Sequence, residues 1–155
     1  MIERRRTRPI KVGSVVIGGA APISVQTMTK TPTEDARATL EQISRAADAG
    51  ADIIRVTCDT EEAGESLKEI VKGSRLPIVA DIHYDAPLAL MALDAGIQCL
   101  RLNPGNIRQP EKVAEIARRC QELGVPIRIG VNAGSLPDRK SHERGRGQWG
   151  PDDVA

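Results

Sequence analysis

The sequence predicts an α/β fold, a parallel (β/α)8 barrel of the TIM type, truncated to about five strands behind an N-terminal β-hairpin. Short apolar segments alternate with segments of helical period, which is typical of parallel βα units. Two stretches are near repeats, DAGADIIRV at 48–56 and DAGIQCLRL at 94–102. A second pair, 76–83 and 125–132, also repeats. Because alternate strands of such a barrel share interior layers, the repetition favours a barrel over an open, doubly wound sheet.

The first elements expected are a hairpin, a strand and a helix. Residues 10–17 place short apolar runs on either side of Gly13-Ser14, which is the pattern of a tight hairpin. An apolar run predicts a strand over 23–28. Thr31-Pro-Thr-Glu34 has the form of a capping box with proline at the first helical position. We therefore expect a helix from this point to Gly50.

The strand–helix unit then recurs along the chain. We expect strands at 52–57, 77–82, 98–102 and 126–131, and helices at about 61–72, 86–95 and 110–123. Gly73 ends one of these helices, and Asp85 is the expected N-cap of the next. The last helix carries Val113, Ile116, Cys120 and Leu123 on one face. Residues 133–150 are rich in glycine and charge, which indicates a loop, and Pro151 is typical of a helix start.

The number of elements is smaller than a barrel needs. A complete barrel has eight strands and typically about 250 residues. This chain of 155 residues predicts five parallel strands and four complete helices. We therefore expect residues 1–155 to be the N-terminal part of a longer barrel.

The composition disfavours several classes of function. The net charge is +1 and aromatic residues make up 1% of the chain, so neither charge nor base stacking favours nucleic acid as a partner. No apolar run approaches the length of a membrane span, and no secretory leader pattern is present, so no membrane partner is expected. The three cysteines lack Cys-x-x-Cys spacing, which disfavours both a disulfide framework and a cysteine metal site. This cysteine usage favours a location in the reducing cytoplasm.

Polar side chains recur where the predicted strands end. They share one parity within each strand, so each set faces one side of the sheet. The set comprises Arg55, Asp81, His83, Arg101, Asn103, Arg128 and Asn132. On the interior side these residues line the C-terminal end, where barrel enzymes place their chemistry. Three arginines against one aspartate favour a ligand with two or more negative charges, because guanidinium groups bind carboxylate and phosphate in bidentate fashion.

Other interpretations of the same residues, including purely structural ones, stay open at this point. The arginines could form a buried salt-bridge network around Asp81. His83 could be an acid–base group, a hydrogen-bond donor to phosphate, or a histidine packed beneath a helix. The Asn-Pro-Gly-Asn segment at 103–106 could cradle an anion or form an ordinary turn. Gly145 to Gly150 matches G-x-G-x-x-G, but no apolar strand precedes it, so a dinucleotide site is disfavoured.

Five segments together give the chain a resemblance to a known family. They are VQTMT at 25–29, ADIIRV at 51–56, VADIH at 79–83, CLRLNPGN at 99–106 and PIRIGVNAGSL at 126–136. The sequence resembles the 4-hydroxy-3-methylbut-2-enyl diphosphate synthase family of the non-mevalonate isoprenoid pathway. The resemblance implies an oxidoreductase that opens the ring of 2-C-methyl-D-erythritol 2,4-cyclodiphosphate reductively. It also implies that the site residues above, with Ser135 nearby, line a diphosphate pocket.

The resemblance further implies a cofactor and partners. The family uses a [4Fe–4S] cluster, reduced by flavodoxin or ferredoxin, and its ligands are three cysteines and a glutamate in a C-terminal domain. Nothing in this sequence corresponds to those ligands, and Cys58, Cys99 and Cys120 are expected to be structural. The family resemblance implies a homodimer in which one protomer's cluster domain covers the other's barrel. We expect this chain to be inactive alone; a non-catalytic anion-binding half barrel and another phosphate-handling barrel enzyme are the alternatives.

Overall fold

The computed structural model describes residues 5, 7–83, 85–103, 107 and 109–130. In chain order the elements are β1 (Ile10–Val12), β2 (Val15–Ile17), β3 (Gln26–Met28), α1 (Ala36–Asp48), β4 (Ile53–Thr57), α2 (Glu61–Gly73), β5 (Ile78–Ile82), α3 (Ala86–Asp94), β6 (Cys99–Leu102), α4 (Pro110–Leu123) and β7 (Ile127–Ile129). The loop predicted at 133–150 and the helix predicted from Pro151 lie outside the described residues.

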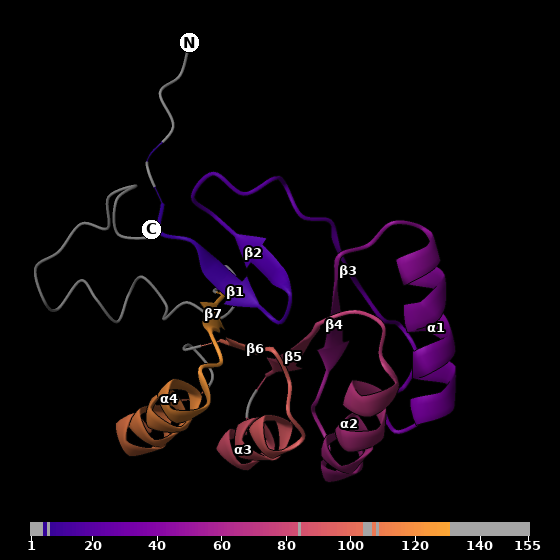
Figure 1. Ribbon diagram of the computed structural model, residues 1–155. Helices are drawn as coiled ribbons and strands as arrows, with labels where there is room; N and C mark the ends of the chain where they lie inside the picture. The colour runs from indigo at the N-terminus through magenta and orange to yellow at the C-terminus, as the bar shows by residue number, and fades with distance from the viewer. Residues whose placement is uncertain (1–4, 6, 84, 104–106, 108, 131–155) are drawn as a thin grey trace, which may run out of the picture.

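The large sheet is parallel throughout, with strand order β3-β4-β5-β6-β7. A helix follows each of β3, β4, β5 and β6 and lies on the same side of the sheet, and Figure 1 shows α1 to α4 arranged in an arc around the strands. Sequential parallel strands that lie side by side, with all crossover helices on one face, are the first part of a barrel. The predicted fold class is confirmed.

Alternate residues of the strands divide the core into two faces. Ile54, Ala80 and Leu100 lie in the larger core cluster together with residues of the helices. Ile53 and Val79 lie in a second cluster on the opposite face, which also contains Val12 of the hairpin. Side chains alternate along a strand, so residues of one parity face the helices and those of the other parity face the barrel interior. The helix-facing residues are apolar.

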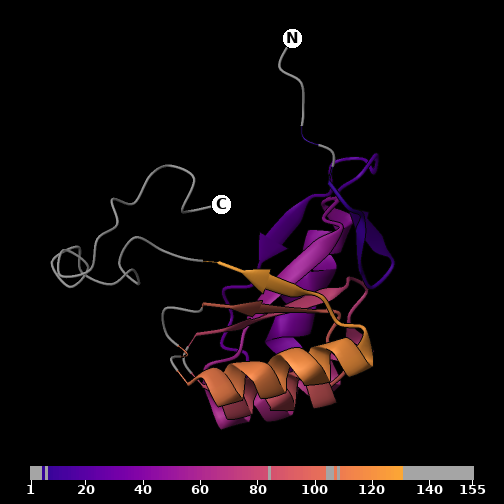
Figure 2. The same ribbon diagram turned by 90° about the vertical axis from the view of Figure 1, so that its left-hand side faces the viewer.

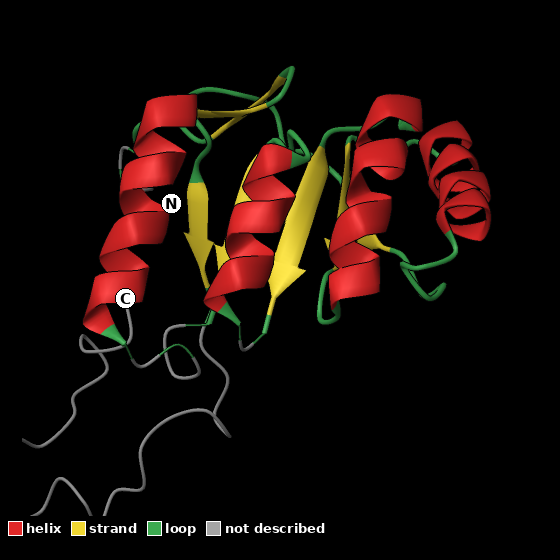
Figure 3. Cartoon of the chain, turned by 90° about the horizontal axis from the view of Figure 1, so that it is seen from below, coloured by secondary structure: helices red, strands yellow, loops and turns green. Residues whose placement is uncertain are grey.

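The β1–β2 hairpin covers one end of the interior. Val12 is fully buried against the interior strand residues, and the hairpin glycine Gly13 adopts a φ of +58°. A Cβ on Gly13 would lie 3.0 Å from Pro77 and 3.1 Å from Gln98, so the turn presses against the residues that precede β5 and β6. Figures 2 and 3 show the hairpin on the side away from the helices, at the end where the parallel strands begin. The opposite, C-terminal end is where the strands point.

The sheet curls strongly, as a barrel wall must. On a flat sheet, four strand spacings would separate β3 from β7 by about 19 Å. The Arg128 side chain on β7 nevertheless donates from Nη1 to Oε1 of Gln26 on β3 at 2.6 Å. The first and last strands therefore face each other across the interior.

The start of the first helix differs from the prediction. The helix begins at Ala36 with Asp35 as its N-cap, whose carboxylate accepts from the Ala38 N–H at 2.9 Å. The hydroxyl of Thr33 donates instead to the Thr57 carbonyl at 2.7 Å, and the Glu34 carboxylate accepts from the Thr60 hydroxyl at 3.0 Å. The predicted capping box of Thr31 and Glu34 is wrong, because Glu34 binds the neighbouring βα loop and the Thr31 hydroxyl shares a hydrogen bond with the Thr39 hydroxyl at 2.8 Å.

Other element boundaries need smaller corrections. The first parallel strand is β3, Gln26–Met28, and not 23–28, because Val25 already bonds the loop residue Asp52 through its N–H at 2.7 Å. Gly73 is the last residue of α2. Asp85 is the N-cap of α3 as predicted, although its side chain makes no capping bond. On α4, Ile116 and Cys120 are buried as expected, whereas Val113 and Leu123 are exposed.

Candidate active site

Four residues stand side by side across the interior face. The strand register pairs Thr57 with Asp81, Asp81 with Arg101 and Arg101 with Arg128. These positions have the parity opposite to the helix-facing residues, so their side chains face the interior. Arg55 lies two residues before Thr57 on the same face of β4. The three strand arginines therefore lie on the face opposite to the helix layer.

Asp81 is the centre of an ion-pair cluster. Its side chain is 1% exposed, and it accepts from Arg101 Nη1 at 2.8 Å through Oδ1. Its second oxygen, Oδ2, lies 3.3 Å from Arg55 Nε and 3.4 Å from His83 Nε2. A buried carboxylate is costly unless it is paired, and these three neighbours provide that pairing. The salt-bridge interpretation therefore holds for two of the three arginines.

Arg128 is held in another way. Its guanidinium donates to the neutral side-chain amide of Gln26, and among the described residues it pairs with no carboxylate. Three guanidinium groups thus share this face with one described carboxylate. The face retains positive charge toward the interior, which is the electrostatic requirement of a site for a phosphate or diphosphate group.

The remaining predicted site residues fall in two groups. His83 lies just after β5 and Asn103 just after β6, both beside the arginines at the C-terminal end, and Asn103 is buried. Asn132 and Ser135 lie outside the described residues, as does most of the 103–106 segment. The described part of the chain therefore brings together Arg55, Asp81, His83, Arg101, Asn103 and Arg128 at one end of one face.

The structure adds three residues that the sequence analysis did not single out. Gln26 holds Arg128, and the sulfur of Met28 accepts from Arg55 Nε at 3.2 Å. The Gly130 carbonyl accepts from Arg101 Nη2 at 3.3 Å, and a Cβ on Gly130 would lie only 2.8 Å from Arg101 Nε. Gln26 and Met28 share the interior parity of β3, so this shared parity, combined with the correct register, is the signal that could have identified them.

The cysteines do not fit an iron–sulfur cluster. All three are buried free thiols, and burial raises the pKa of Cys58 and of Cys120 to about 11. Burial also raises the pKa of Cys99, and the neighbouring Arg128 opposes that shift. Clusters bind thiolates, so these thiols are poorly suited to the task. No group of three potential metal ligands occurs among the described residues.

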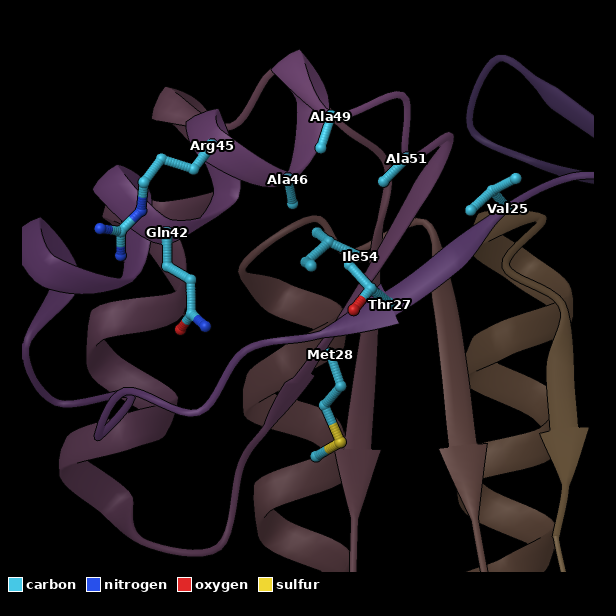
Figure 4. A pocket seen from close by; sticks show the side chains of 9 residues that line it. All are labelled: Val25, Thr27, Met28, Gln42, Arg45, Ala46, Ala49, Ala51 and Ile54. Atoms are coloured by element: carbon cyan, nitrogen blue, oxygen red, sulfur yellow. The ribbon is translucent and has the colours of Figure 1, made fainter.

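A pocket of about 500 Å³ lies on the other side of β3, between that strand and α1. Figure 4 shows Val25, Gln42, Ala46 and Ile54 around it. None of the predicted site residues lines this pocket. Met28, which contacts Arg55 on the interior face, is also one of the residues that line this pocket.

Comparison with known proteins decides the family. A model of the GcpE TIM-barrel domain matches residues 7–152 of this chain. The chain belongs to the GcpE TIM-barrel family. The described part of this GcpE barrel contains no helix of sufficient length and apolarity to cross a membrane.

Curated relatives of this GcpE chain share one name. A protein of Symbiobacterium thermophilum is 57% identical over 138 residues, which are 89% of this chain and 37% of that protein. One of Zymomonas mobilis is 57% identical over 135 residues, which are 87% of this chain and 36% of that protein. Both are named 4-hydroxy-3-methylbut-2-en-1-yl diphosphate synthase (flavodoxin). The chain thus spans little more than a third of the relatives' length.

Solved structures extend the likeness of fold. A Xanthomonas albilineans dihydropteroate synthase with 4-aminobenzoic acid superposes with a TM-score of 0.56 at 16% identity, covering 78% of this chain and 51% of that chain. A second structure of that enzyme gives a TM-score of 0.53 at 18% identity, covering 77% of this chain and 48% of that chain. At such identities the likeness concerns the fold alone. It agrees with the incomplete barrel seen here.

Proposed function

We propose that this chain is the substrate-binding barrel part of a 4-hydroxy-3-methylbut-2-en-1-yl diphosphate synthase. Its interior face would bind the diphosphate of 2-C-methyl-D-erythritol 2,4-cyclodiphosphate. The observation that supports this most directly is the gathering of three guanidinium groups on one face with a single described carboxylate, at the C-terminal end of the strands. The name of the relatives at 57% identity supplies the diphosphate and the reaction class.

The roles of the described residues follow from their contacts. Asp81 fixes the Arg101 guanidinium at 2.8 Å and orients Arg55 from the other side. Arg128 offers its charge without a described carboxylate partner. His83 lies close enough to Asp81 to donate to it, and it remains next to the space that a phosphate would occupy. Together these groups would bind and orient the cyclic diphosphate.

The rest of the reaction needs components other than these residues. Reductive ring opening consumes two electrons, which we propose flavodoxin or ferredoxin supplies through a [4Fe–4S] cluster. Because the buried thiols here do not fit a cluster, we propose that a C-terminal domain of the whole protein holds it. We further propose a cytoplasmic homodimer in which that domain of one protomer covers the barrel of the other.

Isothermal titration of the chain with the cyclic diphosphate tests the binding role. Arg55→Ala and Arg128→Ala are each expected to weaken binding roughly tenfold to a hundredfold, because each removes a charge-assisted hydrogen bond. Arg55→Lys should restore part of the affinity, since lysine keeps the charge and loses the planar fork. Arg75→Ala is the matched control, because Arg75 pairs with Asp48 on the exterior.

The competing interpretations give different results in the same titration. If inorganic pyrophosphate binds as tightly as the cyclic diphosphate, the chain is a general anion-binding half barrel. If Arg55→Ala and Arg128→Ala lower the melting temperature but leave affinity per folded molecule unchanged, the arginines are structural. Failure of the unsubstituted chain to bind the cyclic diphosphate would end the proposal.

A further inference from the structure

Gln26 makes the longest-range side-chain contact on the interior face. Its amide oxygen accepts from Arg128 Nη1 at 2.6 Å, across 102 positions of sequence and from the facing wall of the curled sheet. Both side chains are half-buried. Within the described residues this is the only hydrogen bond of the Arg128 side chain. Within the part of the chain that the structure describes, one N–H is therefore engaged, and no described residue takes up the other donors of the guanidinium.

The chemistry of this partner differs from that of Asp81. A carboxylate orients an arginine and also offsets positive charge, as the single Asp81 carboxylate does for the pair Arg55 and Arg101. A neutral amide orients the guanidinium through one hydrogen bond and leaves the full positive charge in place. Holding a flexible side chain in its binding geometry before the ligand arrives also lowers the entropic cost of binding.

We infer that Gln26 is a positioning residue of the diphosphate site, which fixes Arg128 without placing a negative charge beside it, so that Arg128 presents its full positive charge to the ligand. This inference rests on the proposed function. It divides the three arginines into a pair that shares the one Asp81 carboxylate and a third arginine, with no described carboxylate partner, that faces them. It also assigns a role to the first parallel strand, which contributes no charged residue to the site.

The sharpest substitution is Gln26→Glu, which keeps the accepting oxygen and adds one negative charge. We expect the affinity for the cyclic diphosphate to fall at least tenfold while the melting temperature stays the same or rises. Gln42→Glu is the matched control. Gln42 is also half-buried and also accepts through its amide oxygen, from the N–H groups of Lys30 and Thr31, but it lies on the helix side of the sheet. Equal losses in both variants would overturn the inference, because charge alone would then explain them.

A double-mutant cycle with Gln26→Leu and Arg128→Ala separates positioning from direct contact. Gln26→Leu alone should weaken binding severalfold, and it should have no further effect when Arg128 is already alanine. A further loss in that background, or no loss in the single variant, overturns the inference. If the unsubstituted chain binds the cyclic diphosphate and only the Gln26 predictions fail, the proposed function survives. If the unsubstituted chain does not bind, both fall.

Discussion

The two sequence repeats, 48–56 and 94–102, place an arginine on either side of Asp81, and the two arginines have different surroundings. Arg101 of the second repeat is 9% exposed, bonds Asp81 at 2.8 Å and also donates to the Gly130 carbonyl. Arg55 of the first repeat is 32% exposed, lies 3.3 Å from Asp81 and has the sulfur of Met28 as its other partner. The same local sequence thus gives one enclosed arginine and one accessible arginine.

The position of the strand explains the difference. Arg101 is on β6, which has a strand on each side that contributes a partner, Asp81 from β5 and the Gly130 carbonyl that follows β7. Arg55 is on β4, whose other neighbour is the short strand β3, and that strand offers only a weak acceptor. We infer that Arg101 mainly holds the face together, whereas Arg55 keeps donors available for a ligand.

The largest effect expected from this comparison concerns stability. Arg101→Ala should lower the free energy of unfolding by about 3–5 kcal/mol, because it leaves the buried Asp81 carboxylate short of its best partner. Arg55→Ala should cost about 1–2 kcal/mol, since that contact is longer and more exposed. Urea denaturation followed by circular dichroism measures both values. Equal losses in the two variants would break the comparison.

Gly130→Ala should disturb the second repeat alone. The backbone of Gly130 does not require positive φ, so alanine brings no backbone strain, but its Cβ would lie 2.8 Å from Arg101 Nε and 2.9 Å from Nη2. Displacing the guanidinium should cost about 1–3 kcal/mol, as overpacking of a filled site does. The same substitution should cost almost nothing when Arg101 is already alanine. If Gly130→Ala lowered the free energy of unfolding by the same amount in the Arg101→Ala background, contact with Arg101 would not be the cause of the loss.

Much of this fold could be predicted from the sequence because its signals are local and repeated. Each strand is a short apolar run after a helix stop, and Gly50 and Gly96 both adopt the positive φ that ends such helices. The first helix start was mispredicted for the opposite reason. Thr31 and Glu34 satisfy a local capping pattern, but the Glu34 carboxylate accepts from Thr60 of the next unit and the Thr31 hydroxyl bonds the Thr39 hydroxyl. Such tertiary contacts as that of Glu34 leave no trace in local sequence.

In the candidate site, too, the local pattern could be predicted from the sequence and the tertiary contacts could not. Parity alone predicted that Arg55, Asp81, Arg101 and Arg128 share a face, and the strand register confirms it. Parity could not show that Asp81 pairs with two arginines and leaves the third to Gln26. That depends on how strongly the sheet curls, because only a curled sheet brings β3 and β7 face to face.

The smallest effect on stability is expected from the exterior ion pairs. Each repeat begins with an aspartate that forms one of these pairs. Asp48 bonds Arg75 at 2.6 Å, and Asp94 bonds Arg119 at 3.0 Å, so both repeats tie the end of one helix to the following unit. The hydrogen bond to the Asp94 carboxylate raises the pKa of Arg119. All four side chains are well exposed, and solvent and salt screen such pairs strongly.

We therefore expect Arg75→Ala and Arg119→Ala to change the urea midpoint far less than Arg55→Ala, and the small change should disappear in 1 M salt. The interior arginines should behave differently, because burial shields their pairs from screening. Arg101→Ala should remain strongly destabilising at high salt. If Arg75→Ala or Arg119→Ala destabilised the protein as much as Arg101→Ala, the exterior pairs between helices would be the important feature of the repeats. If neither variant did, the important feature of each repeat is its arginine on the interior face. The enclosed Arg101 then serves mainly stability, and the accessible Arg55 serves mainly binding.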